Sequence, residues 1–186
     1  SKFSAVIGTV ALAVGTTYVR ASMKAIDQTA KFADMIGTGT EELVGLQYAA
    51  KITAGMVDKE FNMALQRMTR RVAEAAQGTG EAKDAIKQLG LDAKALDDMG
   101  VDEAFMEIAD AMQGVENESQ RVRMAFKLFD SEGAKLVNTL SQGSEEIRRL
   151  QREAEQLGIA FNRIDAARVE QANDALTAIG QVIRGI

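Results

Sequence analysis

Residues 88–101 read QLGLDAKALDDMGV, and the signal that decides the fold occurs twice within them. Gly90 and Gly100 each follow an apolar residue and precede another one. This is typical of a helix that ends in a left-handed glycine, with the next apolar side chain folded back onto the last turn. Close variants of the pattern recur at three further positions: Gly37, Gly114 and Gly158. The pattern predicts that helices end at these glycines and that the middle of the chain is a series of short helices, not one continuous rod.

Helix starts can be placed between these ends. Residues that favour the N-cap position occur at five suitable places: Thr40, Asp58, Asp102, Asn117 and Ser144. Asn117 is followed three residues later by Gln120, as in a capping box. Apolar or small residues recur at helical spacing in the intervals, for instance at Leu43, Leu46 and Ala50, and at Phe105, Ile108, Ala109 and Met112. Each helix is therefore predicted to bury one face.

The composition supports an all-α fold. The chain has 186 residues, of which 46% are hydrophobic, and it contains no proline. Its commonest residues are good helix formers, and the length suffices for one sizeable core with extensions. We therefore predict a compact multi-helix domain of short glycine-capped helices at residues 32–158. A hydrophobic N-terminal helix at 1–31 and a heptad-patterned C-terminal helix at 159–186 are predicted to flank it.

The absence of two residue types narrows the chemistry. The chain contains no histidine and no cysteine, which removes the commonest metal ligands, the commonest general base and the thiol nucleophile. Adjacent carboxylates occur at Glu41-Glu42, Asp97-Asp98 and Glu145-Glu146. Neighbours on a helix point about 100° apart, and two of these pairs follow predicted N-caps, where acidic residues suit the helix dipole. We expect no enzyme activity, no metal and no cofactor.

The charge pattern argues against specific nucleic-acid binding. The formal net charge is −5, whereas phosphate affinity rests on basic surface. Two arginine groups could still contact phosphate: Arg67, Arg70 and Arg71, and Arg148, Arg149 and Arg152. Glutamates surround both groups, which favours salt-bridged, solvated helix faces. The stretch Gly78-Thr79-Gly80 lacks the preceding strand and the lysine of a phosphate-binding loop, so it is predicted to be a corner between helices.

The N-terminal segment has two possible roles. The 17 residues from Phe3 to Val19 carry no charge and lie between Lys2 and Arg20. As a helix they would span about 26 Å, the short limit for crossing a bilayer. Apolar residues occur on several sides, so this helix should be buried all round, either in an oligomeric or intramolecular core or in a membrane. The residues expected to make these contacts are Phe3, Ile7, Val10, Leu12, Val14 and Val19.

The C-terminal segment carries a heptad seam. Apolar residues are spaced three and four apart at Val169, Ala172, Leu176, Ile179, Ile183 and Ile186. Such a seam indicates pairing between helices and favours self-association, or a helix that continues in a longer parent protein. Ordinary packing of an amphipathic helix against the domain is an equally good explanation, since fewer than three full heptads are present.

Several stretches resemble one family by their order and spacing. They are DMIG at 34–37, TEELVGLQYAA at 40–50, ALQRM at 64–68, EAAQGTGEA at 74–82, LFDSEGAKL at 128–136 and NDAL at 173–176. Together they resemble the N-terminal-side helical region of the tail tape-measure proteins of long-tailed bacteriophages, over most of residues 27–176. Asp130 stands where the family pattern has glycine. Aspartate can cap the next helix, but it adopts left-handed geometry less readily.

The resemblance implies a structural role in the virion. Tape-measure proteins occupy the tail lumen, set tail length, scaffold tube assembly and leave ahead of the DNA during genome delivery. The implied partners are the tail tube protein and tail assembly chaperones, with several copies in one tail and contact with the host inner membrane on ejection. The implied locations are the virion and, during assembly, the host cytoplasm. The alternatives are a non-phage helical oligomerisation or adaptor module, and a membrane-inserting segment for DNA delivery.

Overall fold

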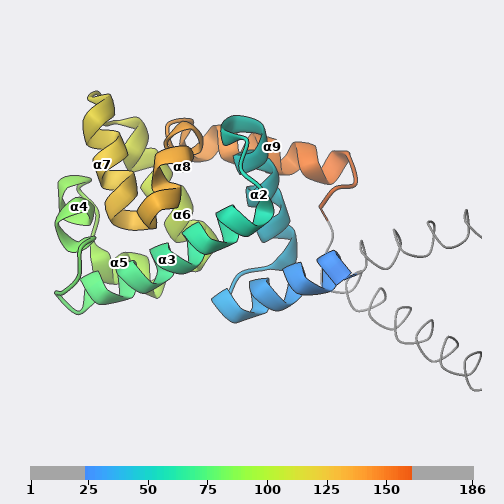
Figure 1. Cartoon of the computed structure of the whole chain (residues 1–186), viewed down its shortest axis with the longest axis horizontal. Helices are drawn as coiled ribbons and strands as arrows, with labels where there is room; N and C mark the ends of the chain where they lie inside the picture. The colour runs from blue at the N-terminus through green and yellow to red at the C-terminus, as the bar shows by residue number, and fades with distance from the viewer. Residues whose placement is uncertain (1–23, 161–186) are drawn as a thin grey trace, which may run out of the picture. The chain divides into compact units, whose positions relative to one another are not determined.

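The computed structural model describes residues 24–160, and these are helical with no strand among them (Figure 1), which confirms the all-α prediction. The chain divides into two compact units, of which Phe32–Phe161 is the larger. A first helix covers residues 24–36. It is followed by α2 Thr40–Ala54, α3 Asp58–Ala76, α4 Lys83–Gln88, α5 Ala93–Asp98, α6 Val101–Gln113, α7 Glu118–Phe129, the 3-10 turn η1 Asp130–Glu132, α8 Gly133–Leu140 and α9 Gly143–Gln156.

Three phenylalanines from three helices form the centre of the core. Phe61 of α3, Phe105 of α6 and Phe129 of α7 are completely buried. The ring of Phe105 meets the other two edge to face, with centroids 5.6 Å from Phe61 and 5.9 Å from Phe129. This geometry is favourable for aromatic rings. Helices that are far apart in the sequence are thereby joined around one apolar centre.

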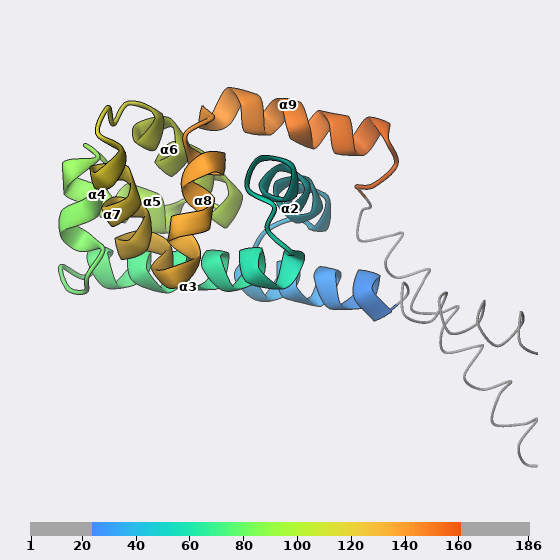
Figure 2. The same ribbon diagram turned by 45° about the horizontal axis from the view of Figure 1, so that its top comes forward.

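Helix α2 lies between α9 and α3 (Figure 2), and its closest neighbour is α9. Gly45 makes the α2–α9 approach possible, because a Cβ at this position would lie 2.8 Å from Cγ and 3.3 Å from Cα of Gln151. The amide of Gln151 donates to the carbonyl of Glu42 at 3.3 Å. Tyr48 donates its hydroxyl to Glu153 Oε1 at 2.8 Å. Two helices about a hundred residues apart in the sequence are thus in direct contact.

Five helices were predicted to end in a left-handed glycine. Three of these glycines have that conformation, and two do not. Gly37, Gly90 and Gly158 have positive φ angles of 76°, 75° and 67° at helix ends. Gly100 instead has the extended geometry of an N-cap, with φ −61° and ψ 151°, and Gly114 has φ −74°. Helices do end close to both glycines. The helix α6 starts immediately after Gly100, however, so the backbone of Gly100 serves that start.

Most of the predicted helix starts are displaced. Asn117 caps α7 as predicted, since its side chain accepts from the backbone N–H of Gln120 at 3.0 Å. The other four predicted N-caps are wrong, because helices begin one or two residues earlier; the observed N-caps are Gly39, Val57, Gly100 and Gln142. Asp92, which was not predicted, caps α5 by accepting from Ala95. The type of side chain alone did not show whether a residue is the N-cap or belongs to the first turn of the helix that follows.

Candidate functional site

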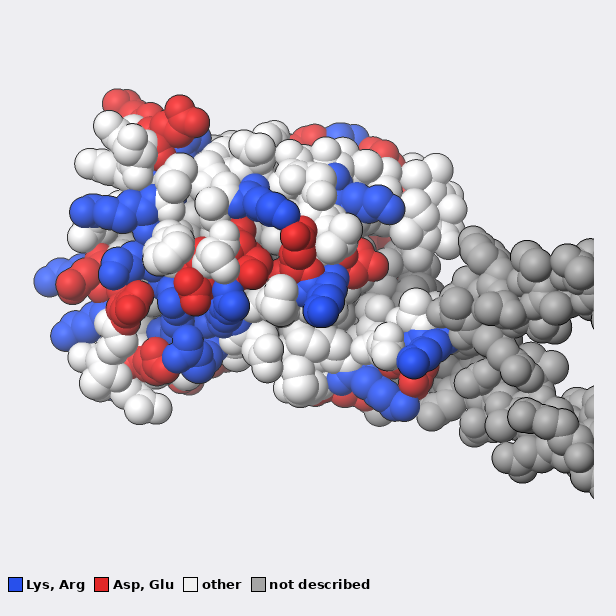
Figure 3. All heavy atoms as spheres, viewed as in Figure 1, with Lys and Arg blue, Asp and Glu red and all other residues white. Residues whose placement is uncertain are grey.

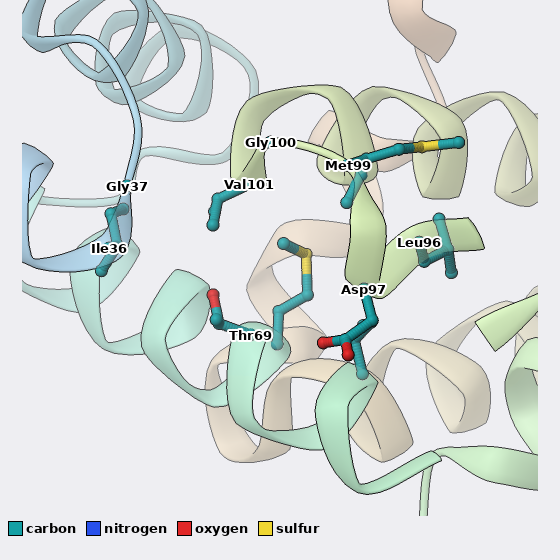
Figure 4. Close-up of a pocket in the computed structure, with 11 residues that line it drawn as sticks. Ile36, Gly37, Thr69, Leu96, Asp97, Met99, Gly100 and Val101 are labelled. Carbon is teal, nitrogen blue, oxygen red and sulfur yellow. The ribbon is translucent and has the colours of Figure 1, made fainter. Parts of the chain in front are cut away.

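An apolar hollow is the main candidate for a binding site in the described part of the chain. It lies beside α3, α5 and the start of α6, and has a volume of about 280 Å³ (Figure 4). Its walls come from three separate stretches of the chain: Ile36 and Gly37; Met68, Thr69 and Val72; and Leu96, Asp97, Met99, Gly100, Val101 and Ala104. The volume is close to the lower limit of small-molecule pockets, so the hollow has room for little more than one large side chain.

The hollow has few polar groups and no cation in its lining. The hydroxyl of Thr69 donates within its own helix, to the carbonyl of Leu65 at 3.0 Å. Asp97 is the only charged residue of the lining, and Figure 4 shows its carboxylate pointing toward α3. Asp97 is exposed, and no ion pair joins it to the described residues, although Lys94 precedes it by one turn of α5.

The first arginine group has structural partners, as its glutamate-rich surroundings indicated. Arg70 pairs with Glu74 at 2.8 Å on the exposed face of α3, and Arg67 pairs with Glu132. Arg71 is different, because its side chain is only 8% exposed. It donates to the carbonyls of Phe126 and Lys127 at 2.8 and 2.6 Å and so completes the C-terminal end of α7. This buried helix cap was not predicted, since it joins residues 55 positions apart.

Asp130 forms the corner between α7 and α8. Its φ of 62° and ψ of −144° fall in a region that residues with a Cβ rarely adopt, and it is the only residue other than glycine with positive φ in the described part of the chain. Its carboxylate lies 3.4 Å from Arg71 and 3.7 Å from Arg67. The corner therefore exists with aspartate in place of glycine. Gly133 follows it, where a Cβ would come within 2.2 Å of the Ala125 carbonyl oxygen.

A polar hollow at the start of α9 contains Arg149 and Arg152 of the second arginine group. It has a volume of about 480 Å³, and Asp110 already occupies the helix end by accepting from the backbone N–H of Ser144 at 2.6 Å. Arg149 pairs with Glu146 at 2.7 Å and with Glu153 at 3.0 Å. The Arg149 hydrogen bond lowers the pKa of Glu146, and the same contacts raise the pKa of Arg149. These pairs support the prediction of a salt-bridged face.

The adjacent carboxylates lie at helix ends, and Asp97 and Asp98 are the last two residues of α5. Glu41 and Glu42 lie in the first turn of α2, and Glu145 and Glu146 lie in the first turn of α9. These are positions where the helix dipole favours negative charge. No group of acidic side chains suited to a metal ion occurs among the residues that the structure describes. Over the face seen in Figure 3, acidic and basic side chains alternate.

Both predicted terminal sites lie outside the described residues. These are the N-terminal helix positions Phe3, Ile7, Val10, Leu12, Val14 and Val19, and the seam positions Val169, Ala172, Leu176, Ile179, Ile183 and Ile186. They stay predictions. Within residues 24–160, none of the helices combines the length and the apolar character needed to cross a membrane.

Comparisons with known proteins found no relative of this chain. No protein-family model, no curated protein and no solved structure matches this chain. The resemblance to tail tape-measure proteins therefore rests on the order and spacing of the sequence motifs alone. The helical unit itself defines only a class, that of compact all-α domains with an interior built from helix faces and glycine contacts.

Proposed function

We propose that this chain is a structural module of a phage tail tape-measure protein. One observation carries the proposal: most of the apolar residues of the family-like motifs in the described part of the chain are buried in the core. The buried apolar members are Leu43, Val44, Leu46, Ala49, Ala50, Ala64, Leu65, Met68, Ala75, Ala82, Leu128, Phe129 and Leu136. A motif set of this kind specifies a fold, which suits a protein whose role is assembly.

The glycines of the same motifs support the proposal in a second way. Gly45 lies in the TEELVGLQYAA stretch and permits the close contact with Gln151. Gly133 lies in the LFDSEGAKL stretch, at a position where a Cβ would collide with the backbone of Ala125. Both glycines serve close packing, and neither lines a reactive site. Packing therefore accounts for the glycines of these two motifs.

The proposed module acts between ruler segments of a longer parent protein. One unbroken helix of residues 32–158 would span about 190 Å, whereas the folded domain is roughly 35 Å across. We expect the module to be strung out inside the tail tube and to refold on release. The tube protein and the assembly chaperones are its expected partners, and several copies are expected side by side in each tail.

An in-frame deletion in the parent gene tests this function. Removing residues 32–158 should shorten the tails by about 190 Å if the segment is a strung-out helix in the lumen, and by roughly 35 Å if it is a folded bead. Tail lengths are measured by electron microscopy of purified particles. An equal-length deletion from a helical stretch elsewhere in the parent is the matched control and should also shorten tails by about 190 Å.

Two results would contradict the proposal. Tails of unchanged length after the deletion would mean that the segment does not lie along the ruler. If the deletion prevents assembly altogether, mass spectrometry of wild-type particles gives the answer instead. Peptides from residues 32–158 should be present in purified tails, and their absence would exclude a tape-measure role.

A further inference from the structure

The apolar hollow beside α3 has room for about one large side chain. Five of its lining residues are buried and form apolar walls: Met68, Val72, Leu96, Val101 and Ala104. Gly37 and Gly100 leave part of the mouth without side chains. Met68 and Met99 contribute flexible thioether side chains, which adapt their shape to different apolar groups.

The only charged residue of the lining is acidic, and the nearest lysine in the sequence, Lys94, lies one turn before it on α5. Asp97 belongs to the lining, and Asp98 follows it at the end of α5. Asp102 lies in the first turn of α6, beside Gly100, where it accepts a hydrogen bond from the hydroxyl of Thr38 at 3.0 Å. Neither lysine nor arginine is among the lining residues. An apolar hollow with an exposed carboxylate at its edge is complementary to an apolar group that lies next to a cation.

We propose that the hollow is a docking site for a basic amphipathic helix of a partner protein. One Leu- or Ile-sized side chain of that helix enters the hollow between Met68 and Met99. A Lys or Arg one turn away, at position i+3 or i+4, pairs with Asp97. Helices dock on apolar grooves through anchors at this spacing, and flanking charges set their orientation. The volume of about 280 Å³ limits the site to a single anchor.

The test uses the full 186-residue chain with ¹³C-labelled methionine methyl groups. The probe is a synthetic alanine-based helix of about four turns with one leucine anchor and lysines at i+3 and i+4, and its twin carries glutamates in place of the lysines. The lysine peptide should shift the methyl signals of Met68 and Met99 saturably. The signal of Met112, which does not line the hollow, should stay in place. The glutamate twin should give no saturable shift.

A charge-neutral variant isolates the role of the carboxylate. Asp97→Asn should weaken binding of the lysine peptide by about threefold, and added salt at about 0.5 M should weaken it similarly. The matched control is Asp84→Asn, which makes the same charge change on α4, away from the hollow. It should leave the affinity unchanged.

Several results would overturn the proposal. These are no shift of Met68 and Met99 at peptide concentrations of about 1 mM, equal binding of both peptides, or unchanged affinity in Asp97→Asn. Benzylammonium tests whether a helix is needed at all, because it combines an apolar group and a cation in one small molecule. If it bound the hollow as tightly as the lysine peptide does, the site would be one for small amines and not a docking site.

Discussion

The Asp130 carboxylate lies 3.4 Å from the guanidinium of Arg71, and this contact accompanies a backbone conformation that glycine adopts far more readily than aspartate. Arg71 in turn donates to the last carbonyls of α7. At this corner, the backbone conformation of Asp130 destabilises the fold and its ion pair with Arg71 stabilises it. Backbone strain at Asp130 costs about 1–3 kcal/mol, while an ion pair whose carboxylate is still 36% exposed contributes about 0–1 kcal/mol.

Replacing Asp130 separates strain from charge. Asp130→Gly removes the strain and the ion pair together, so we expect the free energy of unfolding to rise by about 1 kcal/mol. Asp130→Ala keeps the strain and loses the pair, so we expect it to fall by about 1 kcal/mol. Urea denaturation followed by circular dichroism measures both. Equal stabilities of the two variants would show that the corner is not strained.

Arg71 should be important for stability, whereas its neighbour Arg70 should not. Arg71→Met leaves the carbonyls of Phe126 and Lys127 without their buried donor, and we expect a loss of about 2–3 kcal/mol. Arg70→Met removes only an exposed pair with Glu74 and should cost less than about 0.5 kcal/mol. Thermal and urea unfolding of both variants provide the comparison. Similar losses for the two would contradict the role given to the buried guanidinium.

The α2–α9 contact depends on the missing side chain of Gly45. Gly45→Ala places a methyl group 2.8 Å from Cγ of Gln151, which we expect to destabilise the domain by about 1–2 kcal/mol despite the better helix propensity of alanine. Gln151→Ala removes the nearest atom. The double variant should recover part of the loss, as measured in a double-mutant cycle. Purely additive effects would mean that the two residues do not interact.

The pKa of Tyr48 provides a second measure of the contact between α2 and α9. The hydrogen bond to Glu153 raises the pKa of Tyr48 above its ordinary value of 10.0. The raised pKa means that the folded state holds the hydroxyl proton more tightly than the unfolded state does. The hydrogen bond therefore stabilises the fold fully below pH 10, and this contribution is lost as the pH rises through the raised pKa. Ultraviolet titration in a Tyr18→Phe background follows Tyr48 alone.

Two charge variants complete the titration. Glu153→Gln removes the carboxylate that accepts the hydroxyl proton, so the pKa of Tyr48 should fall back toward 10.0. Glu155→Gln makes the same charge change on α9 at an exposed position and should leave the titration where it is. An unaltered Tyr48 titration in Glu153→Gln would contradict the pairing of Tyr48 with a charged Glu153 in solution.

The parts of the fold that local chemistry determines were predictable. Gly37, Gly90 and Gly158 end helices as their neighbours indicated, and Asn117 caps α7 with the backbone of Gln120. The prediction was wrong where a glycine between apolar residues is followed directly by another helix. Gly100 follows an apolar residue too, but the following helix begins immediately after it, and its φ of −61° serves that start.

The hollow and the buried arginine depend on contacts that sequence spacing does not contain. The lining of the hollow runs from Ile36 to Ala104 and comes together only when α3, α5 and α6 pack. Arg71 belonged to an arginine group expected to be solvated, yet the end of α7 covers it and leaves 8% of its side chain exposed. No periodicity in residues 67–71 distinguishes it from Arg67 and Arg70.

The pairing of α2 with α9 also determines how the domain responds to force. The helical unit begins at Phe32 in the first helix and ends after α9, so tension along the chain would act directly on the first helix and on α9, which contacts α2 around Gly45 and Gln151. We expect the contact between α2 and α9 to separate before the phenylalanine centre does. In the proposed passage through a narrow tail tube, extension would then begin at the contact between α2 and α9.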